Sequence, residues 1–243
     1  MSVSTELWLV LGIAAFYLYD SLVMLEPHQL LLIESGGRWK FFVPLSDWQV
    51  GGKYVYLPNP FMPVQTLYRL DWMQRVDVQV DADVDAVALS TFLKAQWFLR
   101  PVVLVLFCLL AVLLPLAIWQ AAQLRLLLGI VGEIYLFIIA CGVLLYFQRA
   151  ALRLDKKGAL KLAMDGLLCA PFSLNLIRKL GLGYNWQGDP VAFAQGNLKP
   201  ERFVELRDSL LRRIDKDLQM VDEGEHMHKA LQEARRRFSE MGT

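Results

Sequence analysis

One acidic side chain lies inside a stretch of the chain that is otherwise apolar. Glu133 belongs to the run LLLGIVGEIYLFIIACGVLLYF, which extends from Leu126 to Phe147 and is long enough to cross a bilayer. At 1.5 Å per residue it is roughly 10 Å from the nearer end, too deep for a short side chain to reach water easily. We expect Glu133 to face a helix interface, either protonated or paired with a basic group. Asp20 and Arg125 complete this candidate ion or interhelical polar site.

An acidic segment further upstream has part of the spacing of a calcium-binding loop. Asp81, Asp83 and Asp85 fit its first, third and fifth positions. Ala86 and Phe92 then stand where that loop requires a glycine and a glutamate. The alternation of acidic and apolar residues therefore favours the solvated face of a strand over a metal site.

Other residue patterns give no catalytic set. His226 and His228 are two positions apart, so on a helix their rings point to different faces and do not share a metal. The chain has no GxSxG, HExxH or CxxC motif and no phosphate-binding or dinucleotide-binding loop. Asp165, Asn175 and Arg178 are polar residues that could act on lipid, but they form no recognised nucleophile and base pair. We predict no catalytic residues, no metal and no cofactor.

The composition is that of a membrane protein. Hydrophobic residues make up 56% of the 243 residues, against the ~45–50% of ordinary soluble domains. The 25 basic and 24 acidic residues leave a net charge of +1, so the chain has no general positive field to attract nucleic acid. The three cysteines follow neither a disulfide framework nor zinc-ligand spacing.

Three apolar runs have the length of a membrane span, and they predict an integral membrane protein with three transmembrane α-helices. They are Leu7–Leu25, Leu99–Trp119 and Leu126–Phe147. The first forms an N-terminal anchor, residues 1–25. The other two form a tight helical hairpin, residues 99–147, in which Pro115 predicts a local kink.

Basic residues predict how these spans are oriented. None precedes the first span and one lies in the hairpin loop, whereas residues 26–100 carry seven and the segment after the third span carries 17. Because basic residues concentrate on the cytoplasmic side, the N-terminus is predicted outside and the C-terminus in the cytoplasm. The expected location is a cell inner membrane, crossed several times.

Residues 26–98 form the first polar part, which we interpret as a cytoplasmic β-rich subdomain. Short runs with a period of two alternate with turn signals, including the pairs Gly36-Gly37 and Gly51-Gly52. This pattern predicts a small β-meander.

Residues 148–186 form a basic amphipathic segment broken by Pro171. One or two short helices are expected, with an apolar face that rests on the bilayer surface or on the β-meander. The residues expected to contact lipid headgroups are Lys156, Lys157, Lys161, Arg178 and Lys179.

Residues 187–243 contain a linker and a C-terminal cytoplasmic helix that begins at Pro200. Apolar residues recur at spacings of three and four, which predicts a face that binds a partner or folds back on its own protein. These residues are Phe203, Leu206, Leu210, Ile214 and Leu218. The highly charged residues that follow predict a solvated helix or a frayed tail.

These features favour a non-enzymatic scaffold or accessory subunit of a larger membrane assembly. The expected partners are membrane lipid and other membrane or cytoplasmic subunits, with further copies of the chain as one alternative, and not nucleic acid. A transport or ion-coupled component that uses Glu133 is the first alternative. A lipid-acting membrane enzyme is the second.

Overall fold

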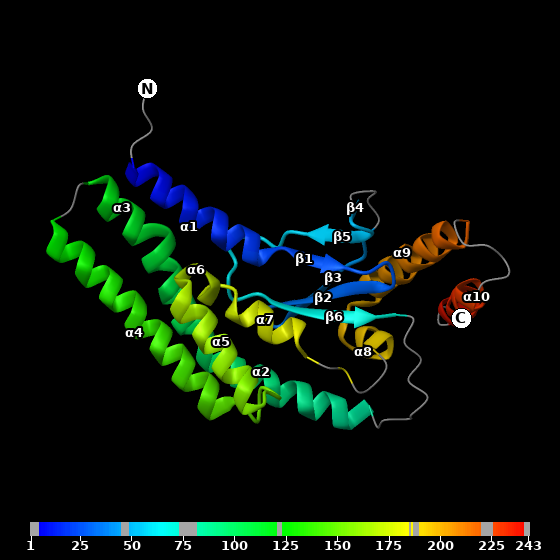
Figure 1. Ribbon diagram of the computed structural model, residues 1–243. Helices are drawn as coiled ribbons and strands as arrows, with labels where there is room; N and C mark the ends of the chain where they lie inside the picture. The colour runs from blue at the N-terminus through cyan, green and yellow to red at the C-terminus, as the bar shows by residue number, and fades with distance from the viewer. Residues whose placement is uncertain are drawn as a thin grey trace. The chain divides into compact units, whose positions relative to one another are not determined.

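The computed structural model describes residues 5–44, 49–72, 82–120, 123–184, 186, 190–219 and 226–240. The chain is mostly helical, with a small region of antiparallel sheet (Figure 1). It divides into two compact units. Unit 1 contains Met1–Val23, Leu57–Thr66 and Ala86–Leu182, and unit 2 contains Met24–Tyr56, Leu67–Asp85 and Gly183–Thr243.

Unit 1 is built from helices. Two of its helical segments, Val87–Trp119 and Leu124–Gln148, are long and apolar enough to cross a membrane. Only 33% and 22% of their most apolar windows are buried within the chain, whereas the core helix of a soluble protein would be mostly buried. The helices are α1 (Thr5–Ser21), α2 (Ala82–Phe107), η1 (Cys108–Leu113), α3 (Leu114–Trp119), α4 (Leu124–Gln148), α5 (Lys156–Leu168), α6 (Ala170–Ser173) and α7 (Leu176–Leu182).

The first predicted span is shorter than expected. Helix α1 is apolar but ends at Ser21, and the strand β1 (Val23–Leu25) occupies the last residues of the run. The change from helix to strand follows directly after two polar residues of the run, Asp20 and Ser21. Helix α1 therefore does not have the length of the two longer segments.

The helix that contains the second predicted span begins before Leu99. Helix α2 starts at Ala82, so residues expected in the β-rich part are helical. Leu89, Phe92 and Leu99 are buried at helical spacing, which shows that the period changes from two to about 3.6 before the apolar run begins. The expected solvated strand around Asp77, Gln79 and Asp81 lies outside the described residues.

Pro115 is preceded by a local departure from α-helical geometry. Residues Cys108–Leu113 form a π-helix, and the Leu114 N–H donates to the Leu109 carbonyl five residues back. Because proline has no N–H and its ring crowds the preceding turn, the wider hydrogen-bond pattern appears just before it. The predicted distortion near Pro115 thus takes the form of a π-helical segment between α2 and α3.

Helix α5 packs on the second half of α4 (Figure 1). A Cβ placed on Gly142 would lie 3.2 Å from Ala163, and one on Gly166 would lie 3.5 Å from Ile138. These glycines let the two helices approach closely. The structure places α5, the first helix of the predicted amphipathic segment, along α4, and the contact of this segment with the bilayer surface stays a prediction. The segment contains three helices, because α6 begins after the break at Cys169 with Pro171 in its first turn.

Unit 2 holds two three-stranded sheets, with strand orders β1-β5-β4 and β3-β2-β6. The remaining strands are β2 (Gln29–Ser35), β3 (Arg38–Phe42), β4 (Gln49–Val50), β5 (Lys53–Tyr56) and β6 (Thr66–Asp71). A meander would keep neighbours in chain order, so the predicted meander is wrong, although two of its hairpins are present. Their turns are Gly36-Gly37 and Gly51-Gly52, with φ between +58° and +77°, a conformation that favours glycine.

Three helices complete unit 2, namely α8 (Pro190–Asn197), α9 (Pro200–Leu218) and α10 (His226–Glu240). The charged C-terminal part is not a solvated helix or a frayed tail. Leu231, Ala234 and Phe238 of α10 are buried, and the Phe238 ring lies 6.5 Å from the Trp72 ring, centroid to centroid. Its apolar residues recur at helical spacing among the charges, which gives α10 a narrow packing face.

Candidate functional site

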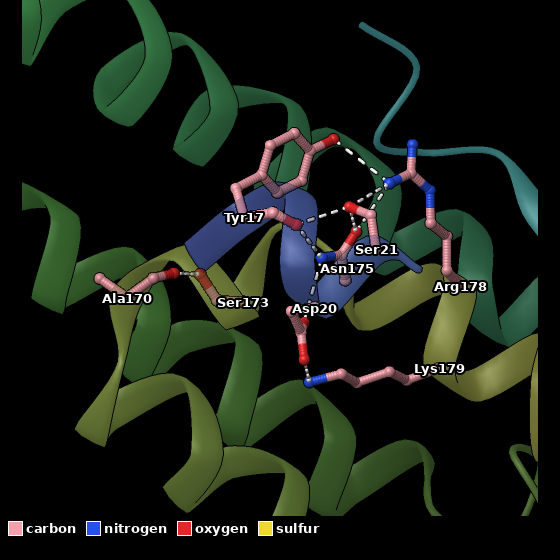
Figure 2. A network of polar contacts seen from close by, with 8 residues as sticks. All are labelled: Tyr17, Asp20, Ser21, Ala170, Ser173, Asn175, Arg178 and Lys179. Atoms are coloured by element: carbon pink, nitrogen blue, oxygen red, sulfur yellow. Dashed lines mark hydrogen bonds and ion pairs between the residues drawn. The ribbon is translucent and has the colours of Figure 1, made fainter. Parts of the chain in front are cut away.

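The end of α1 and the start of α7 form a polar cluster within unit 1 (Figure 2). Tyr17 and Ser21 are four residues apart and share one face of α1. Asn175 precedes α7, and Arg178 and Lys179 lie within its first turn. The side chains of Ser21, Asn175 and Arg178 are 2%, 1% and 2% exposed, so this cluster is enclosed by the protein.

The Arg178 guanidinium is at the centre of the cluster. One of its terminal nitrogens donates to Asn175 Oδ1 at 2.7 Å, Ser21 Oγ at 3.1 Å and the Tyr17 hydroxyl at 3.3 Å (Figure 2). Its carbon also lies 5.8 Å from the centre of the Tyr17 ring. Because a buried cation is costly without such partners, these contacts make the burial of Arg178 possible.

The other terminal nitrogen of Arg178 binds the segment Leu57–Thr66 through main-chain carbonyls. It donates to Asn59 O at 2.7 Å and to Met62 O at 3.0 Å. Between them, the Pro60 carbonyl accepts a 2.6 Å hydrogen bond from the Tyr17 hydroxyl. One arginine therefore joins three segments of unit 1: α1, α7 and this loop.

A half-buried ion pair lies next to the cluster. Lys179 Nζ is 2.9 Å from Asp20 Oδ1, and it also lies 4.9 Å from the Phe172 ring centre. Asn175 Nδ2 donates to the second carboxylate oxygen of Asp20 at 3.0 Å and to the Tyr17 carbonyl at 3.2 Å. Asn175 thus connects this ion pair to Arg178.

The cluster is arranged to hold segments together. The single proton of the Ser21 hydroxyl faces two acceptors, the Tyr17 carbonyl at 2.7 Å and Asn175 Oδ1 at 3.0 Å, and Arg178 donates to its oxygen at 3.1 Å. None of these groups is a base that could activate the serine. The structure brings Asn175 and Arg178 together, as a lipid-acting site would require. Among the described residues, however, no hydrogen bond or ion pair links the Asp165 side chain to either of them.

Arg178 was expected at the lipid interface, and its burial contradicts that expectation. A basic residue beside an apolar stripe is typical of a headgroup contact. The partners of Arg178 are instead Asn175, three residues away, and segments more than 100 residues away in the sequence. Lys179 is only 25% exposed because it pairs with Asp20. Lys156, Lys157 and Lys161 of α5 are exposed.

Glu133 lies on the side of α4 that its own chain leaves uncovered. The buried face of α4 consists of Ile130, Ile134, Ile138, Cys141 and Leu145. Glu133 is exposed, and Gly129 and Gly132 beside it have open space where a Cβ would be. No described residue makes a hydrogen bond or ion pair with its carboxylate, and Arg125 is exposed about two helical turns away. The expected helix interface is therefore not formed with the part of this chain that the structure describes.

The apolar stripe of α9 is used inside unit 2. Phe203, Leu206, Leu210 and Ile214 are between 0% and 8% exposed, and Leu218 is partly exposed. Of the two alternatives, folding back and binding a partner, the structure thus places the stripe on its own unit. Buried Arg213 on the same helix lies 4.4 Å from the Tyr54 ring centre and 3.0 Å from Asp217.

Unit 2 also has a wide polar groove of about 860 Å³ between β3 and α9. It is lined by Lys40, Phe41, Arg202, Glu205, Asp208, Ser209 and Arg212. Its carboxylates are already paired, Glu205 with Arg202 and Asp208 with Arg207.

Several polar residues of unit 1 were missed from the sequence. Tyr17 and Ser21 lie in a run that was interpreted only as an anchor. Gln96, which is fully buried, accepts a 2.9 Å hydrogen bond from the Thr66 hydroxyl, and Arg100 donates to the same hydroxyl at 3.2 Å. The i, i+4 spacing of Gln96 and Arg100 beside an apolar run was the available signal, since it puts both on one helix face.

Comparison of the chain with protein-family models, with curated proteins and with solved structures gives no match. In the described part of the chain, no group of three or more His, Cys, Asp or Glu residues is placed to hold a metal ion. Functional inference therefore rests on the geometry of unit 1.

Proposed function

We propose that the chain is a non-enzymatic, multi-pass membrane subunit that helps to hold a larger membrane assembly together, and that α4 binds a helix of another subunit or of a second copy. Helix α1 is the third span in this proposal. Its apolar part is short, and its polar end, with Asp20 and Ser21, lies at the membrane boundary. The N-terminus lies outside an inner membrane and the C-terminus in the cytoplasm, as the distribution of basic residues favours.

The observation that carries this proposal is the exposed Glu133. Counted along α4, it is about 14 Å from Leu124 and about 22 Å from Gln148, which is inside the hydrocarbon if α4 spans the bilayer. Lipid tails offer a carboxyl group no hydrogen-bond partner, so leaving it lipid-facing is costly. Gly129 and Gly132 allow another helix to approach, as small residues do in membrane helix pairs.

Two differently tagged copies, co-expressed and purified from native membranes in mild detergent, test the partner. The wild-type chain is expected to retain either the second copy or another subunit in fixed stoichiometry, measured by mass spectrometry. Glu133→Leu should lower that ratio at least tenfold. The matched control is Tyr135→Leu, an exposed position on a different side of α4. If the wild-type chain repeatedly purifies without a second copy and without any other subunit in fixed stoichiometry, the proposal is wrong.

Glu133→Gln distinguishes a packing role from ion coupling. Glutamine keeps hydrogen bonds of the neutral acid but cannot release a proton. For a packing role, Gln retains the assembly that Leu loses. An ion-coupled component, which the same carboxylate also favours, would keep its assembly with Gln but lose proton flux in liposomes loaded with a pH-sensitive dye.

Single cysteines at positions 3, 122 and 240, placed in a variant without the native cysteines, test the orientation. An impermeant thiol reagent should label the first two in intact cells and the third only after lysis. Labelling at position 240 in intact cells would overturn the orientation and leave the partner proposal standing.

A further inference from the structure

An apolar groove runs along α1 in unit 1. It has a volume of about 250 Å³ and is walled by α1 on one side and by the end of α2, η1 and α3 on the other. The small side chains Ala14 and Ala111 and the ring of Pro115 leave the space open. Tyr17 closes one end, where its ring lies 6.4 Å from that of Phe107.

The shape of the groove indicates what fills it. On α1 it extends from Val10 to Leu18 and on the opposite wall from Phe107 to Pro115, so it is about 12 Å long on both sides. Dividing 250 Å³ by this length gives a cross-section of about 20 Å². Because the groove is open along one side, an α-helix about 10 Å across could insert side chains into it but not its backbone. A single hydrocarbon chain, about 4 to 5 Å across at carbon contact distances, fits.

The mouth of the groove carries an apolar side chain on a loop whose main chain is held by hydrogen bonds. Phe61 is 80% exposed and lines the groove next to Pro60. The loop that presents it is held by three hydrogen bonds to its carbonyls, from Tyr17 to Pro60 and from Arg178 to Asn59 and Met62. The polar cluster of Figure 2 thus places Phe61 where it can cover an apolar chain lying against α1.

We propose that this groove holds one acyl chain of a bilayer phospholipid, with its headgroup at the Tyr17 end. The proposal rests on the membrane placement of unit 1 given above but not on a partner for Glu133. An acyl chain lying against Ala14, Ala111 and Phe107 would cover apolar surface that the helices leave open and would gain dispersion contacts with it.

Photolabelling in liposomes tests the proposal with a phospholipid that carries a diazirine in its acyl chain. After irradiation and digestion, label in the wild-type chain is expected to concentrate on the peptides containing Ala14 and Ala111. Ala14→Trp fills the groove and should lower that label at least fivefold. Ala15→Trp, on the same helix but outside the groove, should leave it unchanged. Ala111→Trp and its neighbour control Val112→Trp repeat the comparison on the other wall if Ala14→Trp does not fold.

Equal label in the wild type and in both groove variants would show only the lipid that surrounds any span, and would overturn the proposal. Cross-links from this groove to a protein instead of lipid would overturn it as well. The exposed residues of α4 are an internal reference. If unit 1 is not in the membrane, α4 is unlabelled too, whereas failure of the groove proposal alone leaves α4 labelled.

Discussion

Arg178 and Glu133 are two charged side chains of unit 1 with opposite environments. Arg178 is 2% exposed and is bound by a set of oxygens from α1, Asn175 and the loop at 59–62. Glu133 lies on an apolar helix and has no such partner among the described residues. A buried charge such as Arg178, whose hydrogen-bond partners all come from its own chain, stabilises the fold of that chain. A charge left without them in hydrocarbon points to a partner from outside.

The largest effect is expected from removing the centre of the cluster. Arg178→Met keeps much of the side-chain volume but leaves its oxygen partners unsatisfied, so the free energy of unfolding should fall by about 3–5 kcal/mol. Thermal unfolding of the purified chain in detergent measures this, with exposed Lys156→Met as the control. A variant within about 0.5 kcal/mol of the wild type would remove Arg178 from its role as the link between the three segments.

A smaller loss is expected at the residue that connects Arg178 to the Asp20–Lys179 pair. Asn175→Leu has a similar volume but loses its contacts to Ser21, Arg178 and Asp20, so we expect a loss of about 1–3 kcal/mol. In a double-mutant cycle with Arg178→Met, the two losses should sum to more than the loss of the double variant, because both residues serve one network. Strict additivity would show that the two act independently.

Unit 2 has a buried arginine that is paired with a carboxylate, and this sharpens the comparison. Burial raises the pKa of the Asp217 carboxyl, while the neighbouring Arg213 partly opposes the rise. The folded chain therefore binds this proton more tightly than the unfolded chain does. The stability that Asp217 contributes is full below its unfolded pKa and is lost as the pH rises through its folded pKa.

Asp217→Asn mimics the protonated acid at every pH. It should be more stable than the wild type at pH 7, by less than about 1 kcal/mol, and this advantage should vanish on acidification through the pKa of Asp217. Unfolding curves of both proteins from pH 3 to pH 8 give the difference. A variant much less stable than the wild type at pH 7 would mean that Arg213 needs the ionised carboxylate.

The smallest effect on folding is expected at Glu133. Because no described residue pairs with its carboxylate, Glu133→Leu should change the free energy of unfolding of the isolated chain by less than about 0.5 kcal/mol. The same substitution should remove the assembly partner. Large destabilisation of the isolated chain would show that Glu133, like Arg178, serves the fold, and the contrast between them would disappear.

Local features of this fold could be predicted from the sequence, and long-range ones could not. The turns at Gly36-Gly37 and Gly51-Gly52 and the packing face of α9 follow from patterns within a few residues. The order of the strands does not, because β6 pairs with β2 across a long separation.

Arg178 shows why the polar cluster was not predicted. Its sequence neighbours resemble a lipid-facing basic helix, and apart from Asn175 Oδ1 the oxygens that bind it lie 116 to 161 residues away. A single sequence contains no pattern that links such positions. Glu133 differs, since its apolar run alone marks it as unusual, but the side of α4 on which it lies required the packing of α5 and α6.

The three-part composition of unit 1 has a consequence for the order in which the protein is made. Ser21 and Arg178 are 157 residues apart, so at about 5–20 residues per second a ribosome needs roughly 8–30 s to deliver the arginine after the serine. During that time α1 and the loop at 57–66 exist without the group that joins them. The contacts of Arg178 therefore form after the other helices of unit 1 have been synthesised. A chain truncated before Asn175 would keep, of the polar contacts described above between α1 and other segments, the hydrogen bond from Tyr17 to the Pro60 carbonyl.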